Sequence, residues 1–158
     1  MILNKQGKPV LWQVGSDGRI HYSLHKFQKQ ARDDNKTTYL FFIAGSGVGK
    51  SSFIPIKLET WLKKRRGGLY LVLEPSYQKV ETIDRPYITE YFEHTPLKGK
   101  WDEKHRRYSG NGYVIYFGSA DKPDLLEGGQ YDGIICDEIG GYRRRVWQVL
   151  YGRVLLKD

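Results

Sequence analysis

The sequence predicts an α/β fold, in which a parallel sheet is flanked by helices and preceded by a short β-ribbon. Apolar runs of strand length alternate with helical segments along most of the 158 residues. The runs at residues 37–43, 69–75 and 113–119 are almost continuously apolar, which is typical of strands buried on both faces of a parallel sheet. Neither a linker nor an internal repeat interrupts this pattern, so we expect one α/β domain over residues 23–158.

The first half of the chain divides into four expected elements. Residues 1–22 form a β-ribbon appendage, because the turn-forming stretch GSDG separates two short strand-like stretches. The next segment, residues 23–36, has helical periodicity, with Ser23 as the N-cap and Leu24, Phe27 and Ala31 on one face. A buried strand at residues 37–43 and a helix reaching Lys64 then flank a glycine-rich loop.

The second half continues the alternation. We expect strands at residues 69–75, 113–119 and 131–138, and helices at residues 79–93 and 142–155. Between the first of these helices and the strand at 113–119, the stretch KGKWDEKHRRYSGNG reads as a basic loop.

Composition limits the possible functions. The net charge of +8 and the pI near 9.5 favour a polyanionic partner, of which nucleic acid is the commonest. No apolar run reaches the roughly 18 residues that a membrane span needs, so we expect no membrane association. The single cysteine, Cys136, forms no internal disulfide, which fits a reducing cytosol, and is expected to be a small buried apolar residue.

The glycine-rich loop has the chemistry of a phosphate-binding loop. The stretch AGSGVGKS fits the relaxed Walker A pattern, with alanine in place of the first glycine. Glycines bring backbone N–H groups close to phosphate, and the following helix N-terminus adds partial positive charge. Lys50 is placed to reach the β- and γ-phosphates, and the Ser51 hydroxyl to bind Mg²⁺. The expected ATP-binding residues are Ala44, Gly45, Ser46, Gly47, Val48, Gly49, Lys50, Ser51 and Ser52.

Two adjacent acids complete the expected site. The apolar stretch GIIC places Asp137 and Glu138 at the carboxyl end of a strand, where ligands of open α/β sheets bind. Asp137 is expected to hold Mg²⁺, and Glu138 and Lys50 to be catalytic, with Glu138 as the general base for the attacking water. The chain lacks the N-K-x-D motif with which GTPases read guanine, so ATP is the expected nucleotide.

Several segments then resemble one family when they are taken together. These are FQKQAR, LVLEPSYQK, the stretch 117–140 that joins a strand to the acidic pair, and VWQVLYGRVLLKD. Their order and wording resemble the ATPase domain of the large terminase subunit of tailed bacteriophages, over roughly residues 24–158. The resemblance implies a P-loop ATPase that threads double-stranded DNA into a procapsid.

The resemblance also implies partners and further site residues. It implies a homo-oligomeric ring in the bacterial host cytoplasm, with the portal of the procapsid and the small terminase subunit as partners. Gln28 corresponds to a glutamine that reads adenine, and residues 74–76 to a segment that couples nucleotide to DNA. The phosphate-binding loop lacks the arginine of many family members, so the arginine finger is expected from a neighbouring subunit or from Arg143, Arg144 or Arg145.

The resemblance further indicates a domain truncated at its C-terminus. The chain ends after the helix that follows the acidic pair, before the coupling strand and nuclease domain of such proteins, and no nuclease activity is assigned to it.

Two basic segments are candidate nucleic-acid contacts, because each interleaves tryptophan with lysine and arginine. In residues 57–66 the spacing of Trp61 indicates a core residue, so residues 98–107 are the better candidate. The expected DNA contacts are Lys98, Lys100, Lys104, Arg106 and Arg107. His21 and His25 lack partners at ligand spacing, so no metal beyond Mg²⁺ is expected.

Two alternatives share the same motifs. One is a helicase-like translocase or another phage nucleic-acid-dependent ATPase, which would differ downstream of this chain. The other is an ATP-gated DNA-binding or assembly module without useful turnover.

Overall fold

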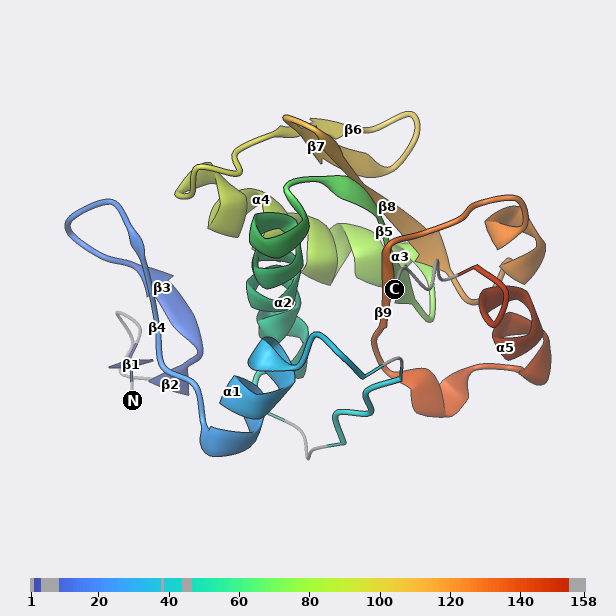
Figure 1. Ribbon diagram of the computed structural model, residues 1–158, viewed down its shortest axis with the longest axis horizontal. Coiled ribbons are helices and arrows are strands. Elements are labelled where there is room, and N and C mark those ends of the chain that lie inside the picture. Colours follow the sequence, from blue (N-terminus) through green and yellow to red (C-terminus); the bar gives the residue numbers. More distant parts are fainter. Residues whose placement is uncertain (1, 4–8, 38, 44–46, 154–158) are drawn as a thin grey trace.

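A five-stranded sheet lies at the centre of the computed structural model, which describes residues 2–3, 9–37, 39–43 and 47–153 (Figure 1). The strand order is β6-β7-β8-β5-β9. The parallel strands are β5 (Gly68–Glu74), β8 (Tyr113–Ser119) and β9 (Gly133–Cys136), with β5 in the middle. β6 (Lys100–Asp102) and β7 (Arg107–Gly110) extend the sheet as an antiparallel hairpin next to β8. The predicted α/β fold with a parallel sheet is confirmed.

Both faces of the sheet are buried because side chains of β5 alternate between two cores. Tyr70 and Val72 point into the larger core, whereas Leu71 and Leu73 point into the smaller one. All four side chains are at most 1% exposed. This explains why the strand reads as a continuous apolar run rather than an alternating one.

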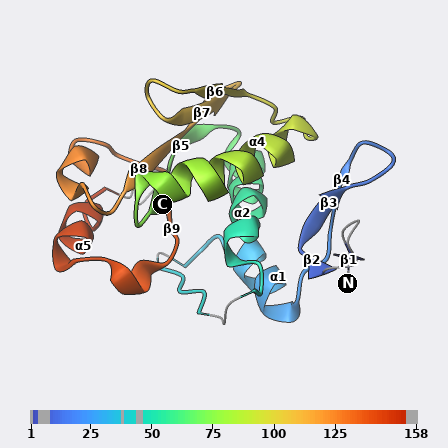
Figure 2. The same ribbon diagram turned by 180° about the vertical axis from the view of Figure 1, so that it is seen from behind.

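Helices cover the two faces separately. α2 (Lys50–Arg65) and α4 (Arg85–Glu93) pack against the larger core. α5 (Arg144–Leu150) and the 3₁₀ turn η2 (Pro123–Leu126) pack against the smaller core. Figures 1 and 2 show α2 and α4 on one side of the sheet and α5 on the other.

The predicted N-terminal ribbon is confirmed. β3 (Trp12–Val14) and β4 (Ile20–Tyr22) form an antiparallel hairpin, and β1 (Ile2–Leu3) pairs with β2 (Pro9–Val10). The ribbon is anchored by Trp12, whose indole N–H donates to the carbonyl of Ser52 at 2.9 Å. The ribbon therefore packs against the first turn of α2.

The first helix differs from the prediction in two details. α1 spans Lys26–Asp33, and its N-cap is His25 rather than Ser23. The backbone N–H of His25 donates to the side-chain oxygen of Gln28 at 2.8 Å, so a glutamine three residues into the helix completes this terminus. The inward face carries Gln28 and Ala31, whereas Phe27, predicted to share a face with Ala31, is 71% exposed.

The buried strand predicted at residues 37–43 is wrong for the residues that the structure describes there, 37 and 39–43. A strand needs a neighbour for its backbone N–H and C=O groups, and no described strand runs beside this segment. Phe42 packs on Phe53 of α2, with ring centroids 5.7 Å apart. Phe41 and Ile43 are instead 61% and 90% exposed.

The helix predicted at residues 79–93 is confirmed, with an irregular start. α3 (Tyr77–Lys79) runs through a π-helical turn (Val80–Asp84) directly into α4. The π turn buries the carboxyl side chain of Asp84, which is 1% exposed. π turns occur often at functional sites.

The basic loop predicted at residues 98–112 is wrong, because it contains the β6–β7 hairpin. Three other predictions are confirmed: the strands at residues 69–75 and 131–138 are β5 and β9, and the helix at residues 142–155 is α5. β9 and α5 are shorter than predicted. Residues from 154 onward lie outside the described ranges. α2 starts at the glycine-rich loop as predicted and tolerates Pro55 inside it. Among the described helices, none is both long and apolar enough to cross a membrane.

A buried lysine fastens α1 to α2. The Lys57 ammonium donates to the carbonyls of Ala31 (2.7 Å), Arg32 (3.2 Å) and Asp34 (2.5 Å), which end α1. A cation at a helix C-terminus also complements the helix dipole. Burial lowers the pKa of Lys57 to about 8, which leaves it protonated at neutral pH. Lys57 therefore stabilises the packing of α1 against α2. Trp61 packs against the larger core, as predicted, and its ring stacks on that of Tyr70.

Replacing Lys57 with methionine should lower the free energy of unfolding by about 2–3 kcal/mol, because three carbonyls lose a charged donor. Urea unfolding followed by circular dichroism measures this loss. Lys64→Met changes an exposed lysine of the same helix and serves as the control. Equal midpoints for the two variants would contradict the role assigned to Lys57.

Candidate functional site

The glycine-rich loop and the acidic strand end, the two predicted halves of the site, lie together although Ser51 and Asp137 are 86 residues apart in the sequence. The Ser51 hydroxyl, in the first turn of α2, donates to Oδ2 of Asp137 at 2.5 Å. Asp137 follows β9 directly and is 8% exposed, and its backbone N–H donates to the carbonyl of Leu73 in β5. The structure therefore brings the glycine-rich loop and the acidic strand end to the same edge of the sheet, as ligand binding in an open α/β fold requires.

In the described part of the loop before α2, two glycines have positive φ angles. Gly47 (φ +76°) and Gly49 (φ +81°) are left-handed, a conformation that glycine adopts readily. α2 begins directly at Lys50, and its 16 residues provide a full helix N-terminus. The Ser52 hydroxyl donates to the carbonyl of Gly49 at 3.1 Å, so it braces the loop. Ala44, Gly45 and Ser46 lie outside the described residues.

The donor atoms at the meeting point fit a magnesium ion. A serine hydroxyl and a carboxylate oxygen, 2.5 Å apart, are hard oxygen ligands of the kind Mg²⁺ takes in nucleotide sites, where phosphates and water complete the shell. The second oxygen of Asp137 accepts the backbone N–H of Glu138 at 2.8 Å, which fixes the carboxylate orientation.

Glu138, the predicted base, lies at the same edge in an unusual conformation. Its φ of +48° is left-handed, which a non-glycine residue adopts at a cost of about 1 kcal/mol or more. Its side chain is half exposed, and its carboxylate accepts a hydrogen bond from the Lys79 ammonium. No sequence pattern points to Lys79, because it and Glu138 are 59 positions apart.

A buried carboxyl pair lies behind the site. Glu74, at the end of β5, and Asp84, in the π turn, are each 1% exposed. In the described part of the chain, their four oxygens have no donor from any other residue. Burial is the main cause that raises the pKa of both groups, and the negative charge of Asp137 raises both further. We expect the two carboxyls to share one proton. Sequence reasoning noted residues 74–76 only through the family resemblance, and missed Asp84.

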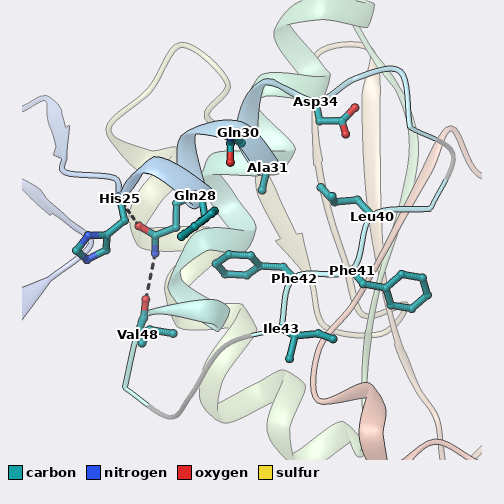
Figure 3. Close-up of a pocket in the computed structure, with 11 residues that line it drawn as sticks. His25, Gln28, Gln30, Ala31, Asp34, Leu40, Phe41, Phe42, Ile43 and Val48 are labelled. Atoms are coloured by element: carbon teal, nitrogen blue, oxygen red, sulfur yellow. Dashed lines mark hydrogen bonds between the residues drawn. The ribbon is translucent and has the colours of Figure 1, made fainter.

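Gln28 is close to the loop, but its amide is already engaged. Its side-chain N–H donates to the carbonyl of Val48 at 3.1 Å, and its oxygen accepts the N–H of His25 (Figure 3). The glutamine thereby ties α1 to the glycine-rich loop. A mostly apolar cavity of about 440 Å³ opens beside it, and Leu40 and Phe41 contribute to its lining. The reading of adenine by Gln28 stays a prediction.

The three predicted finger arginines behave differently. Arg145 pairs with Asp124 at 3.0 Å and with Glu127, both on or beside η2. It therefore fastens α5 to the connector that leads into β9. Arg143 and Arg144 are exposed at the start of α5.

The predicted DNA contacts gather on or beside the β6–β7 hairpin. Lys98 pairs with Glu93, and Arg107 pairs with Asp102 at 3.1 Å. Lys100 and Lys104 are exposed. The guanidinium of Arg106 lies over the Tyr77 ring, 4.3 Å from its centroid.

The remaining candidates are the histidines and the single cysteine. The described residues contain no group of three or more histidine, cysteine or acidic side chains that could hold a metal by themselves. His21 contacts Asp17 on the ribbon surface. Cys136 packs beside the smaller core, and burial raises the pKa of its thiol to about 12.

The described residues form an α/β fold in which the N-terminus of α2, next to a glycine-rich loop, meets an acidic strand end. Among solved structures, the chain is similar to the ATPase domain of the large terminase of Thermus phage P74-26, and equally to a point mutant of that domain. In each case the TM-score is 0.58 and the identity 20%, over 84% of this chain and 62% of the other chain. No protein-family model matches the chain, nor does any curated protein. The family resemblance inferred from the sequence is thus confirmed at the level of the fold.

The carboxyl pair predicts a pH dependence of stability. Because folding raises the pKa of both groups above the ordinary value near 4, their protonated form stabilises the fold at low pH, and this contribution is lost as the pH rises through the raised values. The amide introduced by Asp84→Asn donates to Glu74 without a titratable proton. Between about pH 6 and about pH 9, wild-type stability in urea should therefore fall more steeply than that of Asp84→Asn.

The control for this comparison is Asp121→Asn, which changes an exposed aspartate and should keep the wild-type slope. Parallel curves for wild type and Asp84→Asn would show that the pair does not hold a shared proton.

Proposed function

We propose that the chain is an ATPase motor domain of the phage large-terminase type, which hydrolyses Mg-ATP to translocate double-stranded DNA into a procapsid. The observation that supports this most directly is the Ser51–Asp137 hydrogen bond, which places both candidate magnesium ligands at the N-terminus of α2. The terminase-like fold supports the same assignment.

Each residue has a defined task in this proposal. The backbone N–H groups of the loop and the Lys50 ammonium bind the phosphates, and the apolar cavity beside Gln28 receives the base. Ser51 and Asp137 hold Mg²⁺, which when bound neutralises charge on the β- and γ-phosphates. Glu138 orients the attacking water and accepts its proton. Arg143 and Arg144, which are exposed, are the candidates to reach a neighbouring subunit's nucleotide in a homo-oligomeric ring.

The β6–β7 hairpin is the proposed DNA contact. Lys100, Lys104 and Arg106 are exposed there, and the net charge of +8 favours a polyanion. In this proposal the protein acts in the bacterial host cytoplasm, with the portal, the procapsid and the small terminase subunit as partners.

Phosphate release from ATP with Mg²⁺ and duplex DNA tests the proposal. Glu138→Gln should lower the rate by about 10²–10⁴-fold, because the amide cannot accept a proton. Ser51→Ala and Lys50→Ala should each lower it by roughly 10²-fold or more, through lost stabilisation of phosphate charge.

Matched controls change the same residue types on the surface: Glu90→Gln, Ser16→Ala and Lys29→Ala are all exposed positions and should keep the wild-type rate. A wild type no faster than Glu138→Gln and Lys50→Ala would contradict hydrolysis. If ATP still tightened duplex binding in that case, the ATP-gated DNA-binding module would replace the motor.

A further inference from the structure

The N-terminal ribbon contacts the chain on both sides of the two residues proposed to bind phosphate and Mg²⁺. On one side, a β-carbon built on Gly49 would lie 3.5 Å from the β-carbon of Leu11, so the Leu11 side chain packs against this glycine. On the other side, the indole N–H of Trp12 donates to the carbonyl of Ser52 at 2.9 Å. Two consecutive residues of the ribbon therefore enclose the start of α2.

The first turn of α2 lacks one of its internal hydrogen bonds. In a regular α-helix, the N–H of residue i+4 donates to the carbonyl of residue i. The partner that Ser51 would have is Pro55, which has no backbone N–H, so the helix cannot complete that bond. The Trp12 donor reaches the next carbonyl along the chain, that of Ser52. Trp12 therefore restrains the helix where its own hydrogen bonding is incomplete.

Aromatic packing fixes the position of the Trp12 donor. The Trp12 ring meets Tyr91 edge to face, with centroids 5.2 Å apart, and Tyr87 in the same way at 6.1 Å, both in α4. The Tyr91 hydroxyl donates to the carboxylate of Glu59 in α2 at 2.6 Å. Trp12 itself is only 8% exposed. The indole is thus held by the larger core rather than by the glycine-rich loop that it supports.

The restrained turn carries the Ser51 hydroxyl. This hydroxyl donates to Oδ2 of Asp137 at 2.5 Å, and the backbone of a residue limits the directions its side chain can take. The Ser52 hydroxyl donates to the carbonyl of Gly49 at 3.1 Å, which closes the same turn towards the loop. A shift of this turn would move the Ser51 hydroxyl away from the carboxylate with which it shares the proposed magnesium ion.

We propose that the ribbon is a brace for the first turn of α2, in which Trp12 is a positioning residue for Ser51. The indole N–H holds the Ser52 carbonyl and thereby keeps the Ser51 hydroxyl directed at the magnesium position beside Asp137. This rests on the proposed Mg-ATP site. In this way the ribbon contributes to the affinity for Mg²⁺ without contacting the ion.

Equilibrium binding of a fluorescent AMPPNP, with Mg²⁺ or with EDTA, measures this role. Trp12→Phe removes the N–H donor but keeps an aromatic ring against Tyr87 and Tyr91. It should weaken binding with Mg²⁺ about three- to tenfold, the usual effect of one lost hydrogen bond, and leave binding in EDTA within about twofold of wild type. In the Ser51→Ala background, Trp12→Phe should change neither affinity, because the hydroxyl that it positions is gone. Trp147→Phe, at a half-buried tryptophan of α5, is the control.

Hydrogen exchange of the free protein gives a readout that needs neither nucleotide nor turnover. Trp12→Phe should speed exchange several-fold at the backbone amides of Phe53, Ile54 and Ile56, because the first turn of α2 loses its outside hydrogen bond. The amides of residues 61–65, in the same helix, should keep the wild-type rate. Trp147→Phe should change neither group.

Three results would overturn the positioning role. These are an unchanged affinity of Trp12→Phe in Mg²⁺, an equal loss of affinity with and without the Ser51 hydroxyl, and faster exchange along the whole of α2. The last would show a general loss of stability in place of a local brace.

The two readouts separate this role from the proposed function. A wild type that binds AMPPNP no more tightly with Mg²⁺ than with EDTA would reject the proposed magnesium site, while locally faster exchange in Trp12→Phe would retain the brace. A wild type that gains affinity from Mg²⁺, with Trp12→Phe gaining equally, would retain the site and reject the role of Trp12.

Discussion

The hydrogen bond between Ser51 and Asp137 is the contact on which the rest of the site depends. It requires that α2 begin at the glycine-rich loop and that β9 end beside β5, so that a hydroxyl and a carboxylate meet at one sheet edge. The two cores keep these elements in place, because β5 buries alternate side chains in each of them. Apolar packing on both faces of the sheet therefore fixes the positions of the Ser51 and Asp137 side chains.

A small number of polar contacts attach α1 and the N-terminal ribbon to the glycine-rich loop and α2. Lys57 fastens the end of α1 to α2, and Gln28 ties the start of α1 to the loop carbonyl of Val48. Trp12 brings the N-terminal ribbon to the carbonyl of Ser52. The N-terminal ribbon and α1 thus converge on the loop and the first half of α2, where phosphate is expected to bind. The sequence predicts the ribbon as an appendage, but in the fold it contacts the first turn of α2, next to the loop.

The acidic side of the site combines two kinds of carboxyl group. Glu74 and Asp84 are buried and accept no hydrogen bond from any other described residue, so we expect them to share a proton. Asp137 and Glu138 lie nearer to solvent, with a hydroxyl and an ammonium group as partners. The cluster therefore combines a buried pair whose pKa values are raised by burial with two acids that have polar partners.

The sequence alone determined the local features, namely the α/β class, the β-ribbon, the phosphate-loop pattern and the acidic strand end, because apolar periodicity and glycine spacing are written in consecutive residues. It failed at residues 37–43, where an apolar run predicted a strand, since a strand exists only if another lies beside it. The hairpin within the basic stretch was missed for the related reason that its polar, charged strands carry no apolar alternation. Lys79, Asp84 and the engaged amide of Gln28 were decided by tertiary structure alone, because their partners lie 59, 10 and 20 residues away and no local pattern records which side chains a fold brings together.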